Sequence, residues 1–304
     1  MDRQKVLAIV GPTGIGKTSL SVWLAKQLDG EIISCDSMQV YKKMDIGTAK
    51  VTREEMQGIH HELIDVQNYN EPYNVKAFQE KCRTAIEDVV KRGKFPILCG
   101  GTGLYLKAAL YDYEFQEENE DIAYTTFLNS KTNEELVAML KEKDEKALEK
   151  IHPNNRKRLI RALQICHSGT SKSEQEDKQQ HIPLYDVYFL GLDVNRDILH
   201  DRINKRVDIM FENGLVKEVE DLFTNPETWE YTSFQGIGYK EFKDYFLKEK
   251  SIDEVKTAIK THSRQYAKRQ YTWFKNQMPV HWFEAQNKDE IYSAVKEWLV
   301  DEDK

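Results

Sequence analysis

The chain has 304 residues, and 44 lysines and arginines against 51 aspartates and glutamates give a formal net charge of −7, which at first argues against a nucleic-acid partner. Its hydrophobic fraction of 40% supports a sizeable core and excludes wholesale disorder. No apolar run approaches the roughly 20 residues that span a bilayer, so no membrane segment is expected.

The cysteines and the first residues point to an ordinary intracellular protein. Cys35, Cys82, Cys99 and Cys166 show no C-x-x-C or Cys/His spacing, so neither a disulfide scaffold nor a structural zinc site is expected. The first apolar run leads directly into a glycine-rich turn, and we interpret it as a strand, not as a signal peptide. These features predict a cytoplasmic protein.

Short apolar runs alternate with helical patterns over the first hundred residues. The expected strands are 6–10, 31–34, 61–66 and 95–99, and the expected helices are 18–28 and 77–91. This alternation predicts βαβ units and a parallel sheet, in which ligands bind beyond the carboxyl ends of the strands.

The composition then changes. Residues 114–150 carry eleven acidic and five basic side chains with helical periodicity and no strand signal. A basic helix at about 155–165 follows, and then a polar stretch at 168–180 that we expect to be a flexible loop. Strand character returns at 185–194.

We therefore expect a mainly helical insertion domain at 114–182 within a core formed by 1–113 and 183–304. After residue 196 the core is expected to be mostly helical, with a last strand at 280–285 and a terminal helix.

A phosphate-binding loop stands at residues 11–18. The run Gly-Pro-Thr-Gly-Ile-Gly-Lys-Thr fits G-x-x-x-x-G-K-[ST] between a strand and a helix, so its N–H groups are expected to point at phosphate oxygens. Lys17 is expected to reach the terminal phosphate and the Thr18 hydroxyl to bind Mg²⁺. The predicted binding residues are Gly11, Pro12, Thr13, Gly14, Ile15, Gly16, Lys17 and Thr18. The predicted fold is α/β, with a P-loop NTPase-like parallel sheet core flanked by helices.

The loop identifies a phosphate and not a reaction. An NTPase or kinase would add an apolar strand that ends in a Mg²⁺-binding aspartate. The nearest candidates end at Asp36 and Asp65, and neither follows a long apolar run. A small-molecule kinase or a nucleotide-binding regulatory module stays open as an alternative from a different class.

Further segments carry a resemblance to a known family. They are SCDSMQVY at 34–41, MDIGTAK at 44–50, GGTGLY at 100–105 and RQYAKRQYTW at 264–273. With the phosphate loop, these segments closely resemble the bacterial tRNA dimethylallyltransferases, also called tRNA isopentenyltransferases. The resemblance covers nearly the whole chain and is weakest at 114–150.

The resemblance implies transfer of a dimethylallyl group from dimethylallyl diphosphate to N6 of the adenosine at position 37 of tRNA, 3′ of the anticodon, with release of pyrophosphate. The phosphate loop would then hold the isoprenoid diphosphate, and Mg²⁺ is the expected cofactor. N–H groups, a lysine and a cation can stabilise pyrophosphate as they stabilise a nucleotide leaving group.

The resemblance also assigns catalytic roles. Asp36 is expected to accept the N6 proton, and Thr102 to hydrogen-bond the diphosphate or its bridging oxygen. Arg202 and Arg206 share one helix face, and we favour Arg206 as the diphosphate contact without separating the two. By position alone, Asp36 and Thr102 would be turn residues and the arginines a solvated face.

Two basic clusters favour a tRNA partner. One lies in the helix near 155–165, and the other, at 255–275, has six basic residues and no acidic ones. Interleaved aromatic side chains suit stacking on unpaired bases, although a solvated face with core aromatics is the alternative. The expected tRNA contacts are Asp36, Ser37, Met38, Gln39, Lys157, Arg158, Leu159, Ile160, Arg161, Lys268 and Arg269. The total charge conceals these clusters, and the first argument against nucleic acid is withdrawn.

The expected partner is the anticodon stem-loop, bound by a monomer. The alternative within the same fold is an adenylate isopentenyltransferase that prenylates free AMP or ATP. Such an enzyme would share the phosphate loop, Asp36 and the 100–105 segment, but it has little use for the insertion and the basic clusters.

Overall fold

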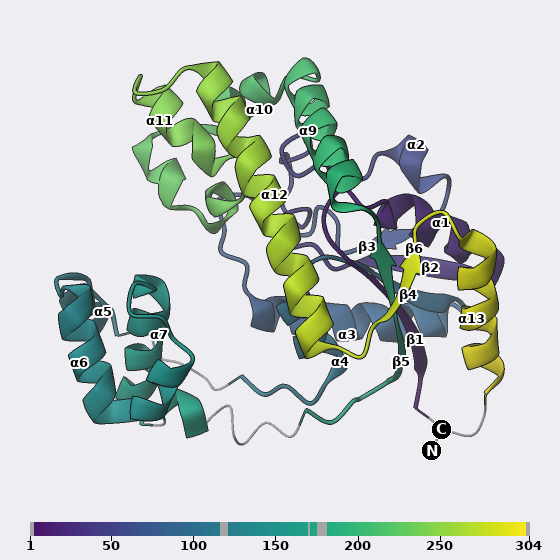
Figure 1. The fold of residues 1–304 in the computed structure, drawn as a ribbon, viewed down its shortest axis with the longest axis horizontal. Helices are drawn as coiled ribbons and strands as arrows, with labels where there is room; N and C mark the ends of the chain where they lie inside the picture. Colours follow the sequence, from purple (N-terminus) through teal and green to yellow (C-terminus); the bar gives the residue numbers. More distant parts are fainter. Residues whose placement is uncertain (1–2, 116–120, 170, 175–180, 302–304) are drawn as a thin grey trace. The chain divides into compact units, whose positions relative to one another are not determined.

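The computed structural model describes residues 3–115, 121–169, 171–174 and 181–301 of the chain (Figure 1). The chain divides into two compact units, one formed by Met1–Tyr111 with Pro183–Lys304 and the other by Asp112–Ile182. Within the described ranges, no helix has the combination of length and apolarity that a membrane crossing requires.

One sheet of six parallel strands forms the centre of the larger unit, in the order β3-β2-β4-β1-β5-β6. The predicted α/β fold with a parallel sheet is confirmed. The strands are β1 (Lys5–Val10), β2 (Gly30–Ser34), β3 (His61–Glu62), β4 (Phe95–Gly100), β5 (Asp186–Asp193) and β6 (His281–Glu284).

Helices flank this sheet. They are α1 (Lys17–Leu28), α2 (Arg53–Met56), α3 (Val75–Lys91), α4 (Gly103–Leu110), α9 (Arg196–Glu212), α10 (Leu215–Leu222), α11 (Lys243–Phe246), α12 (Ile252–Gln277) and α13 (Lys288–Val300). Short 3₁₀ helices lie at Pro226–Glu230, Thr232–Gln235 and Lys240–Phe242.

Side-chain alternation along β1 divides the core into two layers. Leu7 and Ile9 point into the layer formed with α1 and α13, whereas Val6, Ala8 and Val10 point into the layer formed with α3, α4, α9, α10 and α12. All five side chains are fully buried. A strand with helices on both faces needs such a continuous apolar run, which is why this segment is recognisable in the sequence.

The third strand is shorter than the expected 61–66. It ends at Glu62 because Leu63 and Asp65 have positive φ angles of 62° and 56°, which break the extended backbone. The chain that follows β3 pairs with the segment that follows β2 in the sequence, where Gln67 N donates to Val40 O at 2.9 Å.

The smaller unit is a helical bundle made of α5 (Ile122–Asn129), α6 (Asn133–Asp144), a 3₁₀ helix (Glu145–Glu149) and α7 (Arg156–His167). Leu128, Leu136, Leu140, Leu159 and Leu163 form its fully buried centre. Most of the expected flexible loop at 168–180 lies outside the described residues.

Candidate active site

Three loops meet at the carboxyl ends of neighbouring strands. The phosphate loop follows β1, Asp36 lies just beyond β2, and Thr102 lies just beyond β4. Because β4 lies between β2 and β1 in the sheet, these three turns are adjacent although up to 90 residues separate them in the chain. This is the edge at which parallel sheets bind ligands.

The phosphate loop connects the central strand to α1. Gly11, Gly14 and Gly16 have φ angles of 137°, 79° and 106°, a region that residues with a Cβ rarely adopt, so these turns require glycine. The Ile15 side chain is buried in the core formed with α1, and it therefore offers a ligand only its backbone. The Thr18 hydroxyl is on an exposed residue in the first turn of α1.

Lys17 folds back over its own loop. Its Nζ donates to the Gly11 carbonyl at 2.9 Å and to the Pro12 carbonyl at 2.8 Å. Burial lowers the pKa of Lys17 to about 8, against the opposing effects of Cys99 and the Asp36 carboxylate. An anionic ligand would restore the ordinary preference for the charged ammonium.

The two oxygens of the Asp36 carboxylate differ in their hydrogen bonds. Its Oδ1 accepts from the backbone N–H groups of Met38 at 2.8 Å and Gln39 at 3.3 Å, so it stabilises the turn after β2. Its Oδ2 takes part in no hydrogen bond with the described residues, which leaves one oxygen for a substrate. The turn role that position alone suggested is therefore real, and it uses only one of the two carboxylate oxygens.

Thr102 ties the ends of β2 and β4 together. Its backbone N–H donates to Cys35 O at 3.4 Å, and its Oγ1 accepts from Ser37 N–H at 3.3 Å. Tyr266 reaches the same hydroxyl from α12. Burial, with a smaller effect from the Asp36 charge, raises the pKa of Tyr266 to about 12, so its hydroxyl keeps its proton.

Arg202 and Arg206 both reach this site from α9, at different places. Arg202 Nη1 donates to Ile15 O of the phosphate loop at 3.4 Å, and its side chain is on the exposed face of the helix. Arg206 Nη2 donates to Ala49 O at 3.1 Å. Burial lowers the pKa of Arg206, and the Asp36 charge partly offsets that effect. The Asp36 charge therefore acts on Arg206, the more buried of the two arginines.

The segment at 45–49 is part of the site and is itself held by a carboxylate that the sequence did not single out. Glu218 of α10 accepts from the backbone N–H groups of residues 45–47 at 2.7–3.0 Å and from the Tyr239 hydroxyl at 2.7 Å. The Ala49 carbonyl, which accepts from Arg206, also accepts from Gln39 Nε2 at 3.2 Å. The Gln39 side chain thus braces this segment.

Two residues that the sequence analysis named as possible site residues, Asp65 and Met38, contact neighbouring protein groups. Asp65, one of the possible Mg²⁺-binding aspartates, forms an ion pair with Lys50 at 2.6 Å, and Asp45 pairs with the same ammonium. Met38 packs against Gly236, where an added Cβ would lie 2.3 Å from the methionine methyl.

One face of α12 contacts both glycine-rich turns. The Gln270 amide accepts from Thr13 N–H at 2.9 Å and donates to Gly101 O at 3.0 Å. Trp273, one turn further on, covers Gly103 so closely that a Cβ there would lie 2.1 Å from the indole. These residues stand within the family segment at 264–273, but their contacts could not be read from it.

The six basic side chains at 255–275 do not form one free surface. Lys256 and Lys260 both pair with Asp208, at 2.6 and 2.7 Å. Arg264 is half-buried and donates to Asn204 Oδ1 at 2.5 Å. Tertiary contacts therefore occupy three of the six basic side chains, and the two that were named as expected tRNA contacts are not among these three.

Lys268 and Arg269 remain on the exposed side of α12. Neither forms an ion pair with another described residue. The Arg269 guanidinium lies 5.7 Å from the centre of the Tyr266 ring, so this exposed side of α12 adjoins the residue that approaches Thr102.

The basic helix α7 is divided in the same way. Arg156 donates to the carbonyls of Lys131 and Asn129 at 2.7 and 2.9 Å and so closes the end of α5. Leu159 is 0% exposed and its side chain belongs to the core of the smaller unit, so a contact with tRNA at this position is left to its backbone. Ile160 also packs against this core. Among the predicted tRNA contacts in α7, the residues with exposed side chains are Lys157, Arg158 and Arg161.

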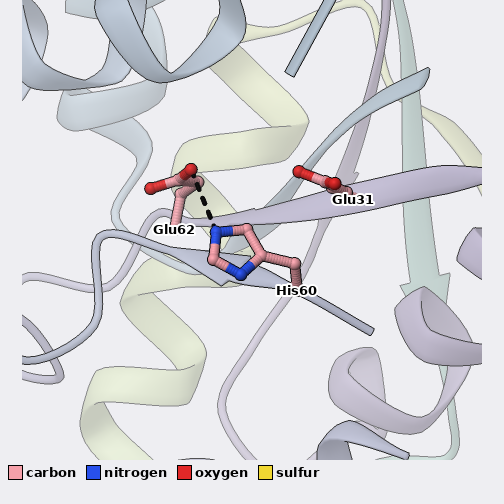
Figure 2. A group of neighbouring side chains, drawn as sticks. All are labelled: Glu31, His60 and Glu62. Carbon is pink, nitrogen blue, oxygen red and sulfur yellow. Dashed lines mark hydrogen bonds and ion pairs between the residues drawn. The ribbon is translucent and has the colours of Figure 1, made fainter. Parts of the chain in front are cut away.

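One group of possible metal ligands lies away from these turns. Figure 2 shows Glu31, His60 and Glu62, whose ligand atoms lie within 4.8 Å of one another. Arg92 already bridges the two carboxylates, with Nη2 at 2.6 Å from Glu31 and 2.8 Å from Glu62. The guanidinium occupies both carboxylates and balances one of their two charges, so we interpret the group as an ion-pair network and not as a metal centre.

Comparisons with known proteins agree with this geometry. Residues 39–277 match a family model described as IPP transferase. A tRNA dimethylallyltransferase of Bacillus anthracis is 50% identical over 290 residues, covering 94% of this chain and 92% of that protein.

Solved structures are similar as well. The full-length tRNA isopentenylpyrophosphate transferase of Bacillus halodurans has a TM-score of 0.74 and 41% identity, covering 98% of this chain and 97% of that one. A eukaryotic dimethylallyltransferase, studied in crystallographic snapshots of its action on tRNA, has a TM-score of 0.83 and 31% identity, covering 98% and 79% of the two chains.

Proposed function

The chain belongs to the IPP transferase family, and we propose that it transfers a dimethylallyl group from dimethylallyl diphosphate to N6 of the adenosine at position 37 of tRNA, releasing pyrophosphate. The observation that carries the proposal is the meeting of the phosphate loop, Asp36, Thr102 and Arg206 at one edge of the sheet. The cytoplasm, where tRNA is modified, is the proposed location.

The reaction forms a bond between N6 and C1 of the prenyl group and breaks the bond from C1 to the bridging oxygen. The exocyclic amine is a poor nucleophile, so orientation and proton removal both contribute to the rate. Asp36 Oδ2 accepts the N6 proton. The loop N–H groups, Lys17 and Arg206 hold the pyrophosphate as its charge develops, and Thr102 hydrogen-bonds its bridging oxygen.

Mg²⁺ fits the donor set of the phosphate loop. This hard cation prefers oxygen ligands and keeps several waters, so it needs few protein groups beside the diphosphate. The Thr18 hydroxyl, on the exposed first turn of α1, is the group that would hold it. When bound, the ion neutralises part of the pyrophosphate charge.

For the acceptor, we propose the anticodon stem-loop. The adenine must leave its stack to reach Asp36, at a cost of a few kcal/mol. Lys268 and Arg269 are proposed to contact the phosphates beside the site, and Ser37, Met38 and Gln39 to border the adenine. In the smaller unit, the phosphate contacts are proposed at Lys157, Arg158 and Arg161. Every proposed group lies on one chain, so we propose that a monomer is active.

Incubation with labelled dimethylallyl diphosphate and Mg²⁺ tests this function, with tRNA, AMP or ATP as the acceptor. We expect label in tRNA, on N6 of a single adenosine in the anticodon loop after nuclease digestion. Label in AMP or ATP but not in tRNA would instead identify an adenylate isopentenyltransferase. Hydrolysis of ATP without any prenylation would refute the whole class.

A further inference from the structure

A buried side-chain amide joins two separate phosphate-binding turns. Gln270 is 6% exposed, so its polar groups depend on protein partners and not on water. The Thr13 N–H of the phosphate loop donates to its Oε1, and its Nε2 donates to Gly101 O of the turn after β4. Both bonds have ordinary lengths, 2.9 and 3.0 Å, so one amide spans the gap without a bridging water.

The space around this bridge is tight. A Cβ added to Gly101 would lie 2.1 Å from Gln270 Nε2 and 3.3 Å from Gly11 O. The two turns therefore nearly touch, and only a glycine leaves room for the amide between them. A residue packed at both ends in this way resists a change in the distance between the turns.

The bridge also belongs to a continuous contact along α12. The Tyr266 hydroxyl, one turn before Gln270, lies beside the Thr102 side chain, and Trp273, one turn after, lies on Gly103. Residues spaced i, i+4 and i+7 share one helix face. This single face therefore contacts the turn after β4 at three places and the phosphate loop at one.

We propose that Gln270 is a positioning residue that fixes the spacing between the phosphate loop and the Gly101–Thr102 turn, so that both turns engage one diphosphate at once. The inference rests on the proposed function, which places the two phosphoryl groups of dimethylallyl diphosphate between these turns. Gln270 itself touches neither substrate nor reacting atoms. Because Gln270 already holds the two loops at a fixed spacing, binding of the donor does not have to order them, and the entropic cost of binding is lower.

The spacing role makes a selective prediction. Pyrophosphate spans both turns, whereas inorganic phosphate can occupy the phosphate loop alone. In Gln270→Met, which keeps the volume but loses both hydrogen bonds, we expect the inhibition constant of pyrophosphate and the KM for dimethylallyl diphosphate to rise about tenfold. The inhibition constant of inorganic phosphate and the KM for tRNA are expected to change by less than about twofold.

Two further variants keep the test sharp. Gln270→Asn retains the amide but is one methylene shorter, so it reaches one turn and not both, and it should show the same selective loss. Gln277→Met changes an exposed glutamine on the same helix and should match the wild type. Thermal unfolding of each variant identifies any that does not fold, and the foldable member of the Gln270 pair then decides the question.

Each outcome is decisive. An equal loss for phosphate and pyrophosphate would mean that Gln270 only supports the phosphate loop, and wild-type constants in Gln270→Asn would exclude a bridging role. Failure of the proposed function looks different, because wild-type protein would then bind pyrophosphate without prenylating tRNA. The inhibitor comparison can be made as direct binding by calorimetry in that case.

Discussion

Replacing Glu218 by alanine removes the acceptor of four hydrogen bonds at once. Three of the donors are the backbone N–H groups of Asp45, Ile46 and Gly47, and the fourth is the Tyr239 hydroxyl. Asp45 and Ile46 retain solvent exposure, so water can replace the carboxylate there. Gly47 is buried and Tyr239 is 0% exposed, so these two donors lose their partner without a substitute.

The cost follows from the two donors that stay buried. An unsatisfied buried donor costs about 1–3 kcal/mol, so the free energy of unfolding should fall by about 2–6 kcal/mol. At about 2–4 °C per kcal/mol for a domain of this size, a central value of about 4 kcal/mol lowers Tm by about 8–16 °C. Glu218→Gln keeps one carbonyl oxygen and should lose about half as much.

Differential scanning calorimetry measures this effect, and Glu220→Ala is the matched control. Glu220 lies on the same helix with an exposed side chain, and it should shift Tm by less than about 2 °C. The KM for dimethylallyl diphosphate should also rise in Glu218→Ala, because Ala49 would no longer present its carbonyl to Arg206. A Glu218→Ala Tm within 2 °C of wild type, measured as for the control, would refute the claim that this carboxylate holds the 45–49 segment.

Three further predictions concern the proposed reaction. Asp36→Asn keeps the carbonyl oxygen that stabilises its turn, so we expect normal Tm and tRNA affinity with kcat lowered about 10²–10⁴-fold, measured by single-turnover prenylation. Arg206→Met should raise the KM for the donor about 100-fold, whereas Arg202→Met, which changes an exposed and screened charge, should raise it less than about tenfold. The double variant Lys268→Gln/Arg269→Gln should reduce the slope of log Kd for tRNA against log salt by about 0.7–1 per lost phosphate contact, measured by filter binding.

The control for the salt dependence is a lysine whose charge is already paired within the protein. Lys256→Gln removes an ammonium held by Asp208 and should leave the salt slope unchanged. An identical slope in the Lys268/Arg269 variant would show that these side chains do not contact tRNA phosphates. Wild-type kcat in Asp36→Asn would exclude Asp36 as the base. Equal increases in the KM for the donor in Arg202→Met and Arg206→Met would contradict the assignment of the diphosphate contact to the more buried Arg206.

Local rules explain which elements could be predicted. The strands at 6–10 and 95–99 are continuous apolar runs, because helices cover both faces of the sheet, and the observed strands agree with them closely. The third strand was predicted too long, because Leu63, Ile64 and Val66 resemble a strand although positive φ angles at Leu63 and Asp65 interrupt it. Periodicity reports burial, and it does not report the sign of a backbone angle.

The same contrast holds for charge. The count over 255–275 correctly located six basic residues without an acidic one, but two of them pair with Asp208 of another helix. In α7 the structure buries the Leu159 side chain in the core and leaves its neighbours Lys157, Arg158 and Arg161 exposed. Long-range partners of this kind have no local signal in one sequence.

The sequence by itself determined the α/β class, the phosphate loop and the membership of a family, because each depends on residues that are close together in the chain. Only the tertiary structure decided how the turns after β1, β2 and β4 meet, which arginine donates to the Ala49 carbonyl, and which segments Glu218 and Gln270 contact. The contacts of Arg206, Glu218 and Gln270 with these segments join residues more than 150 positions apart. Their partners are chosen by the order of strands in the sheet and by the packing of α9, α10 and α12, and no spacing along the chain encodes that choice.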